Sequence, residues 1–275
     1  IQSSLESGVV SSLSGTAPGI REIVTAANEG DKLAYNVLTE AAAVMGQYCD
    51  ILGFRSFPKL QDREEDYSES LFNKFVKYSG VPVVSLESAT LHPLQSFADL
   101  ITITENWNSP TPPLGDAGRG LPKVVLTWAP HVKALPQAVP NSFSEWMCRA
   151  QAEGLLEFVI THPEGFELKD SFTQGAAIEF NQDAALKGAD FVYVKNWSSY
   201  RDYGKTIQGA ESWMMNHKKL EPTNQAKVMH CLPVRRDYEL SSEILDGPHS
   251  LVIPEAGNRV WSAQTVLKNM LEGLR

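Results

Sequence analysis

Basic and polar side chains recur directly after short apolar runs of this 275-residue sequence. Four of them carry a positive charge, namely Arg55, Lys195, Arg235 and Arg259. The guanidinium donors of arginine form a fixed fork that suits a planar or phosphoryl anion. His92 and Gln95 lie at the start of a predicted helix, where free N–H groups also favour an anion. The chain has a net charge of −9, from 24 Lys and Arg against 33 Asp and Glu, so these residues predict a local pocket for a small anion.

A covalent mechanism has weaker support in the sequence. Cys231 is a potential nucleophile, but the only base beside it is His230, and adjacent residues of a strand point to opposite faces. A cysteine in the wall of a pocket is the simpler interpretation. The three cysteines are widely spaced and form no C-x-x-C, which argues against a disulfide framework and favours a reducing cytoplasm.

Several other function classes leave no signature in the sequence. Neither H-x-x-x-H nor H-E-x-x-H occurs, and we expect no metal and no cofactor. The nucleotide-binding patterns G-x-G-x-x-G and G-x-x-x-x-G-K-[ST] are absent as well. The acidic balance argues against a nucleic-acid surface, and no apolar stretch is long enough for a membrane-spanning helix. The first residues do not resemble a secretion signal, so we expect a cytoplasmic protein.

The candidate ligand-binding residues follow seven short runs that are nearly continuous in apolar character, as in strands buried on both faces of a parallel sheet. We predict strands at residues 48–55, 81–87, 123–130, 157–163, 191–197, 227–233 and 250–254. Apolar spacing predicts helices at 33–45, 67–78, 94–104, 144–153 and 260–274. Ser142 and Ser144 are predicted to cap the fourth helix. This alternation predicts a doubly wound α/β fold, with ligands beyond the carboxyl ends of the strands.

A stretch rich in proline and glycine divides these elements. Residues 106–122 contain four prolines and three glycines, and we interpret them as a linker or loop between two domains. The first domain would span 41–105 and the second 123–255. Residues 256–275 would form a C-terminal helix that packs back on the first domain, and residues 1–40 would be a divergent N-terminal segment.

Five segments carry a resemblance to a known family. They are HPLQSFADLITI (92–103), TWAPH (127–131), LPQAVPNSF (135–143), HCLPVRR (230–236) and PEAGNR (254–259). Together they resemble the aspartate/ornithine carbamoyltransferases, of which H-P-x-Q and H-C-L-P are family-wide signatures. The combination of TWAPH with LPQAVPNS is more specifically similar to the carbamoyltransferases of N-acetylornithine and N-succinylornithine. The resemblance covers the chain from about residue 41 to its last residue.

The resemblance implies transfer of a carbamoyl group from carbamoyl phosphate to the δ-amine of an N-acyl-L-ornithine, acetyl or succinyl, in arginine biosynthesis. It also implies two doubly wound parallel-sheet domains, a knot near residues 135–143, no metal and a homotrimer. The attacking amine has a free pKa of about 10.4 and must lose a proton, which the leaving phosphate can accept. Holding both substrates in attack geometry would supply much of the acceleration, without a covalent intermediate.

The resemblance also implies roles for individual residues. Carbamoyl phosphate would be bound by Arg55, His92, Gln95, Cys231, Leu232 and Arg259. Arg55 and His92 would polarise the carbonyl oxygen as it becomes an oxyanion, while Cys231 would act through its backbone carbonyl. The acylornithine would be bound by Glu87, His131, Asn141, Lys195, Leu232 and Arg235.

The N-terminal part departs from the family pattern. Family members bind phosphate through an S-x-R-T-R motif at a helix N-terminus, and this sequence contains no S-x-R-T. We therefore expect a truncated first domain. Two alternatives stay open: an inactive relative that binds an amino acid or assembles with an intact subunit, and a nicotinamide-dependent dehydrogenase of similar fold, which lacks its dinucleotide fingerprint here.

Overall fold

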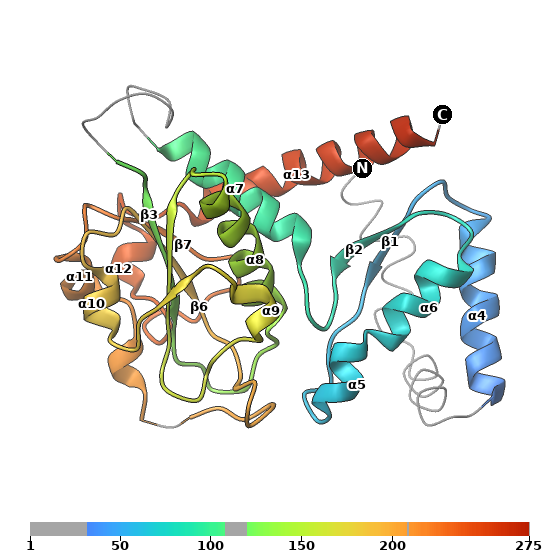
Figure 1. Cartoon of the computed structure of the whole chain (residues 1–275), viewed down its shortest axis with the longest axis horizontal. Helices are drawn as coiled ribbons and strands as arrows, with labels where there is room; N and C mark the ends of the chain where they lie inside the picture. The colour runs from blue at the N-terminus through green and yellow to red at the C-terminus, as the bar shows by residue number, and fades with distance from the viewer. Residues whose placement is uncertain (1–31, 108–119, 208, 275) are drawn as a thin grey trace. The chain divides into compact units, whose positions relative to one another are not determined.

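The computed structural model describes residues 32–107, 120–207 and 209–274, which form two units (Figure 1). The first unit holds the described residues up to Pro93 and from Ala263 onward, and the second holds those from Leu94 to Ser262. The predicted N-terminal segment 1–40 and linker 106–122 lie mostly outside the described residues. No helix in the described part is long and apolar enough to cross a membrane.

The first unit contains two parallel strands with helices beside them (Figure 1). The strands are β1 (Leu52–Arg55) and β2 (Val83–Glu87), and the helices are α4 (Lys32–Gly46), α5 (Arg63–Ser68) and α6 (Ser70–Tyr78). A single helix was expected at 67–78, but Glu69 has a left-handed backbone with φ 52°, which ends α5 before α6 begins. Phe54 of β1 stacks on Phe75 of α6, with ring centroids 4.2 Å apart, in a small apolar core.

The second unit is built on a five-stranded parallel sheet. Its strands are β3 (Lys123–Trp128), β4 (Glu157–Thr161), β5 (Ala177–Ile178), β6 (Phe191–Lys195) and β7 (Lys227–Met229), in the order β5-β4-β3-β6-β7. From β3 the chain adds β4 and β5 on one side, and β6 and β7 then follow on the other. Ligands of such sheets bind beyond the carboxyl ends of the strands at this switch point, here between β3 and β6.

Helices cover both faces of this sheet (Figure 1). The helices of this unit are α7 (Pro93–Asn106), α8 (Ala138–Ala152), α9 (Asp170–Thr173), α10 (Gln182–Leu186), η1 (Glu211–Trp213), α11 (His217–Leu220), α12 (Ser242–Leu245) and the first part of α13 (Val252–Gly273), whose residues from Ala263 onward belong to the first unit. Along β3, Leu126 and Trp128 belong to one apolar core with Phe143 of α8. Val125 belongs to the core on the opposite face, with Leu186 of α10. The predicted α/β fold with parallel sheets is confirmed.

Two sequence predictions in the second unit are wrong. Residues 250–254 form no strand, because α13 begins at Val252 and Ser250 makes only an isolated bridge to Val228. Helix α8 begins at Ala138 rather than at 144, with Pro140 in its first turn, where a missing N–H is tolerated. Ser142 and Ser144 are therefore buried inside this helix and do not cap it.

Candidate active site

Three predicted ligand-binding residues lie together in the first unit, at and just beyond the carboxyl ends of its strands. Arg55 ends β1 and Glu87 ends β2. Arg55 Nη2 donates to Glu87 Oε2 at 2.5 Å, and His92 Nε2 lies 3.9 Å from the same oxygen. The buried carboxylate of Glu87 therefore holds a guanidinium and an imidazole close to each other.

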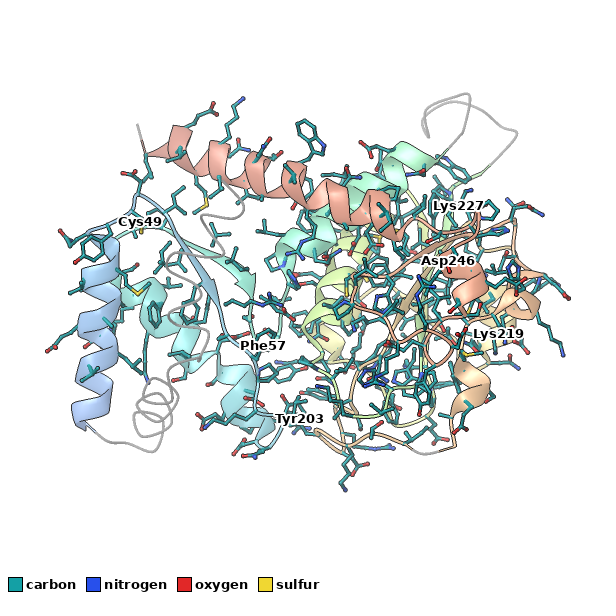
Figure 2. The ribbon with its side chains drawn as sticks, turned by 180° about the vertical axis from the view of Figure 1, so that it is seen from behind. Cys49, Phe57, Tyr203, Lys219, Lys227 and Asp246 are labelled. Atoms are coloured by element: carbon teal, nitrogen blue, oxygen red, sulfur yellow. The ribbon has the colours of Figure 1, made fainter. Side chains whose placement is uncertain are left out.

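The Arg55 side chain keeps binding capacity beyond this ion pair. It is 41% exposed, whereas the Glu87 side chain is 9% exposed. Its guanidinium lies over the ring of exposed Phe57, 4.7 Å from the ring centroid. Figure 2 labels Phe57. A guanidinium has five N–H donors, and the bond to Glu87 uses one of them. The cluster can therefore bind an additional anion or carbonyl oxygen.

A second cluster lies at the carboxyl edge of the five-stranded sheet. Lys195 is the last residue of β6, opposite Trp128 of β3, and is mostly buried. His131 follows β3 and is also buried, and the Nδ2 of Asn196 donates to the carbonyl oxygen of Ala129 at 2.6 Å. The positive potential of Lys195 and His131 reaches the nearby His230, whose pKa is lowered chiefly by burial and further by these two residues.

His230 fixes the conformation of the H-C-L-P segment. Its backbone N–H donates to Glu255 Oε2 at 2.9 Å, and its Nδ1 accepts from the N–H of Leu232 at 2.9 Å. The ring is neutral near pH 7, so its proton is on Nε2, 3.8 Å from Glu239 Oε1. Within the described residues, the backbone carbonyls of Cys231 and Leu232 accept no hydrogen bond, which leaves both oxygens available to a ligand.

The Cys231 thiol is not prepared for nucleophilic attack. Burial raises its pKa to about 11, although the charge of Lys195 acts in the opposite direction. The group is therefore a neutral thiol near pH 7, and a thiolate is required for nucleophilic chemistry. Its neighbour is the hydroxyl of Tyr193, which is also protonated because burial raises its pKa. The geometry supports a cysteine in the wall of a pocket.

The twin arginines after β7 have different partners. Arg236 donates to both carboxylate oxygens of Asp246, at 2.7 and 2.8 Å. Arg235 is bonded through its backbone: its N–H donates to Glu239 Oε2 at 2.7 Å, and its carbonyl oxygen accepts from the N–H of Glu239 at 3.0 Å and of Tyr238 at 3.3 Å. Its side chain forms no ion pair with any described residue. Of the four basic residues predicted at strand ends, only Arg55 has an ion pair within the described ranges. Lys195, Arg235 and Arg259 keep charge for an anionic ligand.

Gln95 has a fixed amide orientation. The residue is 1% exposed, and its Nε2 donates to Asp99 Oδ1 at 2.8 Å and to Glu255 Oε1 at 3.1 Å. Both amide hydrogens are therefore used, while Oε1 is buried and accepts nothing from the described part of the chain. Neither carboxylate was predicted from the sequence. The signals were the i, i+4 spacing of Gln95 and Asp99 on one helix, and the glutamate of P-E-A-G-N-R.

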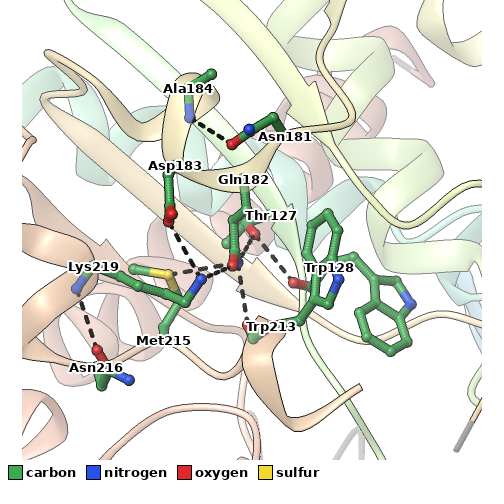
Figure 3. A network of polar contacts seen from close by, with 10 residues as sticks. All are labelled: Thr127, Trp128, Asn181, Gln182, Asp183, Ala184, Trp213, Met215, Asn216 and Lys219. Carbon is green, nitrogen blue, oxygen red and sulfur yellow. Dashed lines mark hydrogen bonds and ion pairs between the residues drawn. The ribbon is translucent and has the colours of Figure 1, made fainter. Parts of the chain in front are cut away.

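Two further polar residues, Asn141 and Gln182, are buried in the second unit. Asn141 is buried in the first turn of α8, which begins earlier than predicted. The Nε2 of Gln182 on α10 donates to Thr127 Oγ1 of β3 at 2.7 Å and to the carbonyl oxygen of Trp213 at 3.1 Å (Figure 3). Lys219 Nζ donates to Gln182 Oε1 (Figure 3). This network attaches η1 and α11 to the end of β3, next to the segment that carries His131.

Known proteins resemble this chain along most of its length. The relative N-succinylornithine carbamoyltransferase of Bacteroides thetaiotaomicron is 49% identical over 248 residues, which are 90% of this chain and 73% of the relative. N-acetylornithine carbamoyltransferase of Xanthomonas campestris pv. campestris is 31% identical over 247 residues, 84% of this chain and 70% of the relative. A crystal structure of acetylornithine transcarbamylase complexed with acetylcitrulline has a TM-score of 0.74 at 29% identity, and the alignment covers 85% of this chain and 72% of that one.

Two family profiles match the sequence. The profile described as "Aspartate/ornithine carbamoyltransferase, carbamoyl-P binding domain" matches residues 6–105. The profile described as "Aspartate/ornithine carbamoyltransferase, Asp/Orn binding domain" matches residues 141–270. Together they cover more than half of the chain and confirm the resemblance carried by the five sequence motifs. The chain belongs to the aspartate/ornithine carbamoyltransferase family.

Proposed function

We propose that this protein transfers the carbamoyl group of carbamoyl phosphate to the δ-amine of an N-acyl-L-ornithine, giving an N-acyl-L-citrulline and phosphate in arginine biosynthesis. N-succinyl-L-ornithine is the expected acceptor, because the relatives named for it are 49% identical and those named for the acetyl compound 31–32%. The proposal rests on one structural observation above all: three acceptor oxygens in the second unit suit a carbamoyl –NH₂ group.

These oxygens are Gln95 Oε1 and the backbone carbonyls of Cys231 and Leu232. None of them accepts a hydrogen bond within the described residues. Glu255 links their supports, because one of its oxygens accepts from Gln95 and the other from His230. A carbamoyl –NH₂ offers two donors and no charge, so neutral acceptors match it better than carboxylates. We call these three oxygens the carbamoyl receptor. The receptor would also select a carbamoyl group over an acetyl group, because an acetyl group has no hydrogen-bond donor.

The reaction needs no covalent enzyme intermediate. The lone pair of the δ-amine attacks the carbamoyl carbon, the new C–N bond forms, and the C–O bond to phosphate breaks. The departing phosphate carries the bonding electrons away and accepts the proton that the amine loses. In the first unit, Arg55 and His92 suit the carbonyl oxygen on which negative charge develops. In the second, Arg259 adds positive charge for the phosphoryl group.

The acceptor substrate would use the edge of the five-stranded sheet. Lys195 and Arg235 suit its α-carboxylate, because neither forms an ion pair within the described ranges. His131 and Asn141 are assigned to the acyl group of the acylornithine, and the Leu232 carbonyl to its attacking amine. Glu87 is assigned to the acylornithine without a specific group. These assignments follow the family resemblance and agree with the positions of Lys195, His131 and Leu232 around His230.

A second candidate function is binding of an acylated amino acid without transfer. The observation that favours it is the absence of S-x-R-T from the sequence, since that motif is the family's main phosphate cradle.

The decisive experiment offers carbamoyl phosphate to the purified chain with N-succinylornithine, N-acetylornithine or ornithine in parallel. Citrulline-type product and phosphate should appear in equal amounts with N-succinylornithine. No turnover with any acceptor from a folded sample would overturn the proposal. Calorimetric binding of N-succinylornithine by that inactive sample would support the second candidate.

A further inference from the structure

Two buried carboxyl groups, Asp99 of α7 and Glu255 of α13, are hydrogen-bonded to Gln95, which carries one of the three acceptor oxygens of the second unit. Both residues have no exposed surface. The amide nitrogen of Gln95 donates to both, and the backbone N–H of His230 donates to the second oxygen of Glu255. Glu255 is thus an acceptor through both oxygens, whereas Asp99 uses only Oδ1, and its Oδ2 is buried without a described hydrogen-bond partner.

Two negative charges that accept from the same amide nitrogen in a buried site are unstable. Desolvation disfavours each ionised form, and each carboxylate repels the other. Burial accordingly raises the pKa of Asp99 to about 7, and burial together with the charge of Asp99 raises the pKa of Glu255 well above its ordinary value. Near neutral pH the pair therefore retains a proton.

Other groups around the pair do not supply a full counter-charge. The titratable and charged residues that face it are Tyr193 of β6, Cys231 beyond β7 and Arg259 of α13. Tyr193 and Cys231 are neutral near pH 7 because burial raises the pKa of both. Arg259 favours the ionised carboxylates, but this effect is smaller than that of desolvation. One shared proton is the remaining way to limit the charge.

We propose that Asp99 and Glu255 are positioning residues that share one proton and hold Gln95 and the His230–Cys231–Leu232 turn in the geometry that receives the carbamoyl –NH₂. The inference rests on the proposed function for its kinetic part. Glu255 connects the two halves of the receptor through one carboxylate. Asp99 directs the Gln95 amide so that Oε1, not Nε2, faces the ligand. Loss of the shared proton places two charges together and disturbs both halves at once.

The geometry predicts different outcomes for the two neutral isosteres. Glu255→Gln exchanges one acceptor oxygen for an NH₂ group, so either Gln95 or His230 loses its acceptor. Its kcat/KM for carbamoyl phosphate should fall about 10- to 100-fold, the range expected for a hydrogen bond to a charged group, while KM for the acylornithine is unchanged. Asp99→Asn keeps Oδ1 as an acceptor and mimics the protonated acid, so most activity should remain at pH 7. The ratio of Asp99→Asn to wild-type activity should rise as the pH is raised above about 7.

Thr102→Val is the matched control. Thr102 is also a buried polar residue of α7 and accepts from Asn258 of α13 at 3.0 Å, so the substitution breaks a bond between the same two helices away from the receptor. Its kinetics should match the wild type. If Thr102→Val and Glu255→Gln lower kcat/KM equally, or if the Asp99→Asn ratio does not change with pH, the two acids are only structural and the proposal is overturned.

Infrared spectroscopy tests the shared proton without any turnover. A protonated buried carboxyl has a C=O stretch distinct from that of a carboxylate, and this band should be present at pH 7 in the wild type and in Thr102→Val. It should disappear in Asp99→Asn and in Glu255→Gln. If the wild type turns over but shows no such band, the shared proton alone is overturned. If the wild type shows the band but does not turn over, the proposed function and the kinetic role that rests on it are overturned.

Discussion

The twin arginines after β7 permit a sharp test of the acceptor site. Arg235 and Arg236 are adjacent and both exposed, yet Arg236 is held by two hydrogen bonds to Asp246 and Arg235 forms no ion pair with any described residue. The backbone of Arg235 is anchored to Glu239, so its side chain leaves from a fixed point. Under the proposed function, Arg235→Ala should weaken binding of the acylornithine and Arg236→Ala should not.

The size of the effect follows from the exposure of Arg235. A hydrogen bond between charged partners contributes about 1.5–3 kcal/mol, and the lower end applies because water competes for this side chain before the substrate binds. About 1.4 kcal/mol corresponds to a factor of ten in an equilibrium constant. Arg235→Ala should therefore raise KM for N-succinylornithine about tenfold and leave KM for carbamoyl phosphate unchanged. Arg235→Lys should recover part of the loss, since an ammonium keeps the charge without the fork.

The assay is steady-state product formation with each substrate varied in turn, together with the urea midpoint of every variant. Arg236→Ala controls for loss of one positive charge in the same segment. Equal effects of the two alanine variants would show that the net charge of the segment acts and not a specific contact. A rise in KM for carbamoyl phosphate alone would assign Arg235 to the other substrate. Either result would refute the reasoning.

Further predictions follow from other buried groups. Gln182→Leu leaves the Thr127 hydroxyl and the Trp213 carbonyl without this donor, so it should lower the free energy of unfolding by about 2–4 kcal/mol in urea titrations. Asn181→Ala, which removes only an exposed helix cap, should cost about 1 kcal/mol, and an equal loss in both variants would contradict this. Cys231→Ser should keep turnover within about tenfold, because a buried thiol with a pKa of about 11 is no nucleophile, and a far larger loss would show covalent catalysis. Burial lowers the pKa of His162 below 6.5, so the unfolded chain binds a proton at a higher pH than the folded chain. The free energy of unfolding should therefore fall as the pH drops below 6.5. His162→Phe should reduce this pH dependence. Light scattering should give about three times the mass of one chain, as the family resemblance implies.

The fold could be predicted where the spacing of apolar residues and the length of the run indicated the same kind of element. Six of the seven predicted strands overlap observed ones, because continuous apolar runs of five to eight residues suit a sheet buried on both faces. Residues 250–254 failed because the same kind of run also begins a buried helix, here α13. Periodicity does not separate these cases, and Pro254 is tolerated in a first helical turn. Strand β5 has two residues, too few to carry a pattern.

The candidate site was predictable at strand ends and not within the core. Lys195 and His131 were identifiable because parallel strands place their carboxyl ends at one edge. Asp99, Glu239 and Glu255 are buried acids, which composition alone assigns to the surface. Their roles depend on contacts with residues distant along the chain, such as the bond between Gln95 and Glu255, which are 160 positions apart.

Under the proposed function, the buried acids explain how an acidic chain would bind anionic substrates. Glu255 accepts from His230 and Gln95, and Glu239 accepts from the backbone of Arg235, so each carboxylate is already used as an acceptor. A retained proton reduces the charge of the Asp99–Glu255 pair further. Lys195, Arg235 and Arg259 form no ion pair within the described ranges. The backbone carbonyls of Cys231 and Leu232 accept no hydrogen bond there. Substitution of Glu255 should therefore not improve anion binding by removing negative charge, because an acceptor that holds Gln95 or His230 would be lost with it.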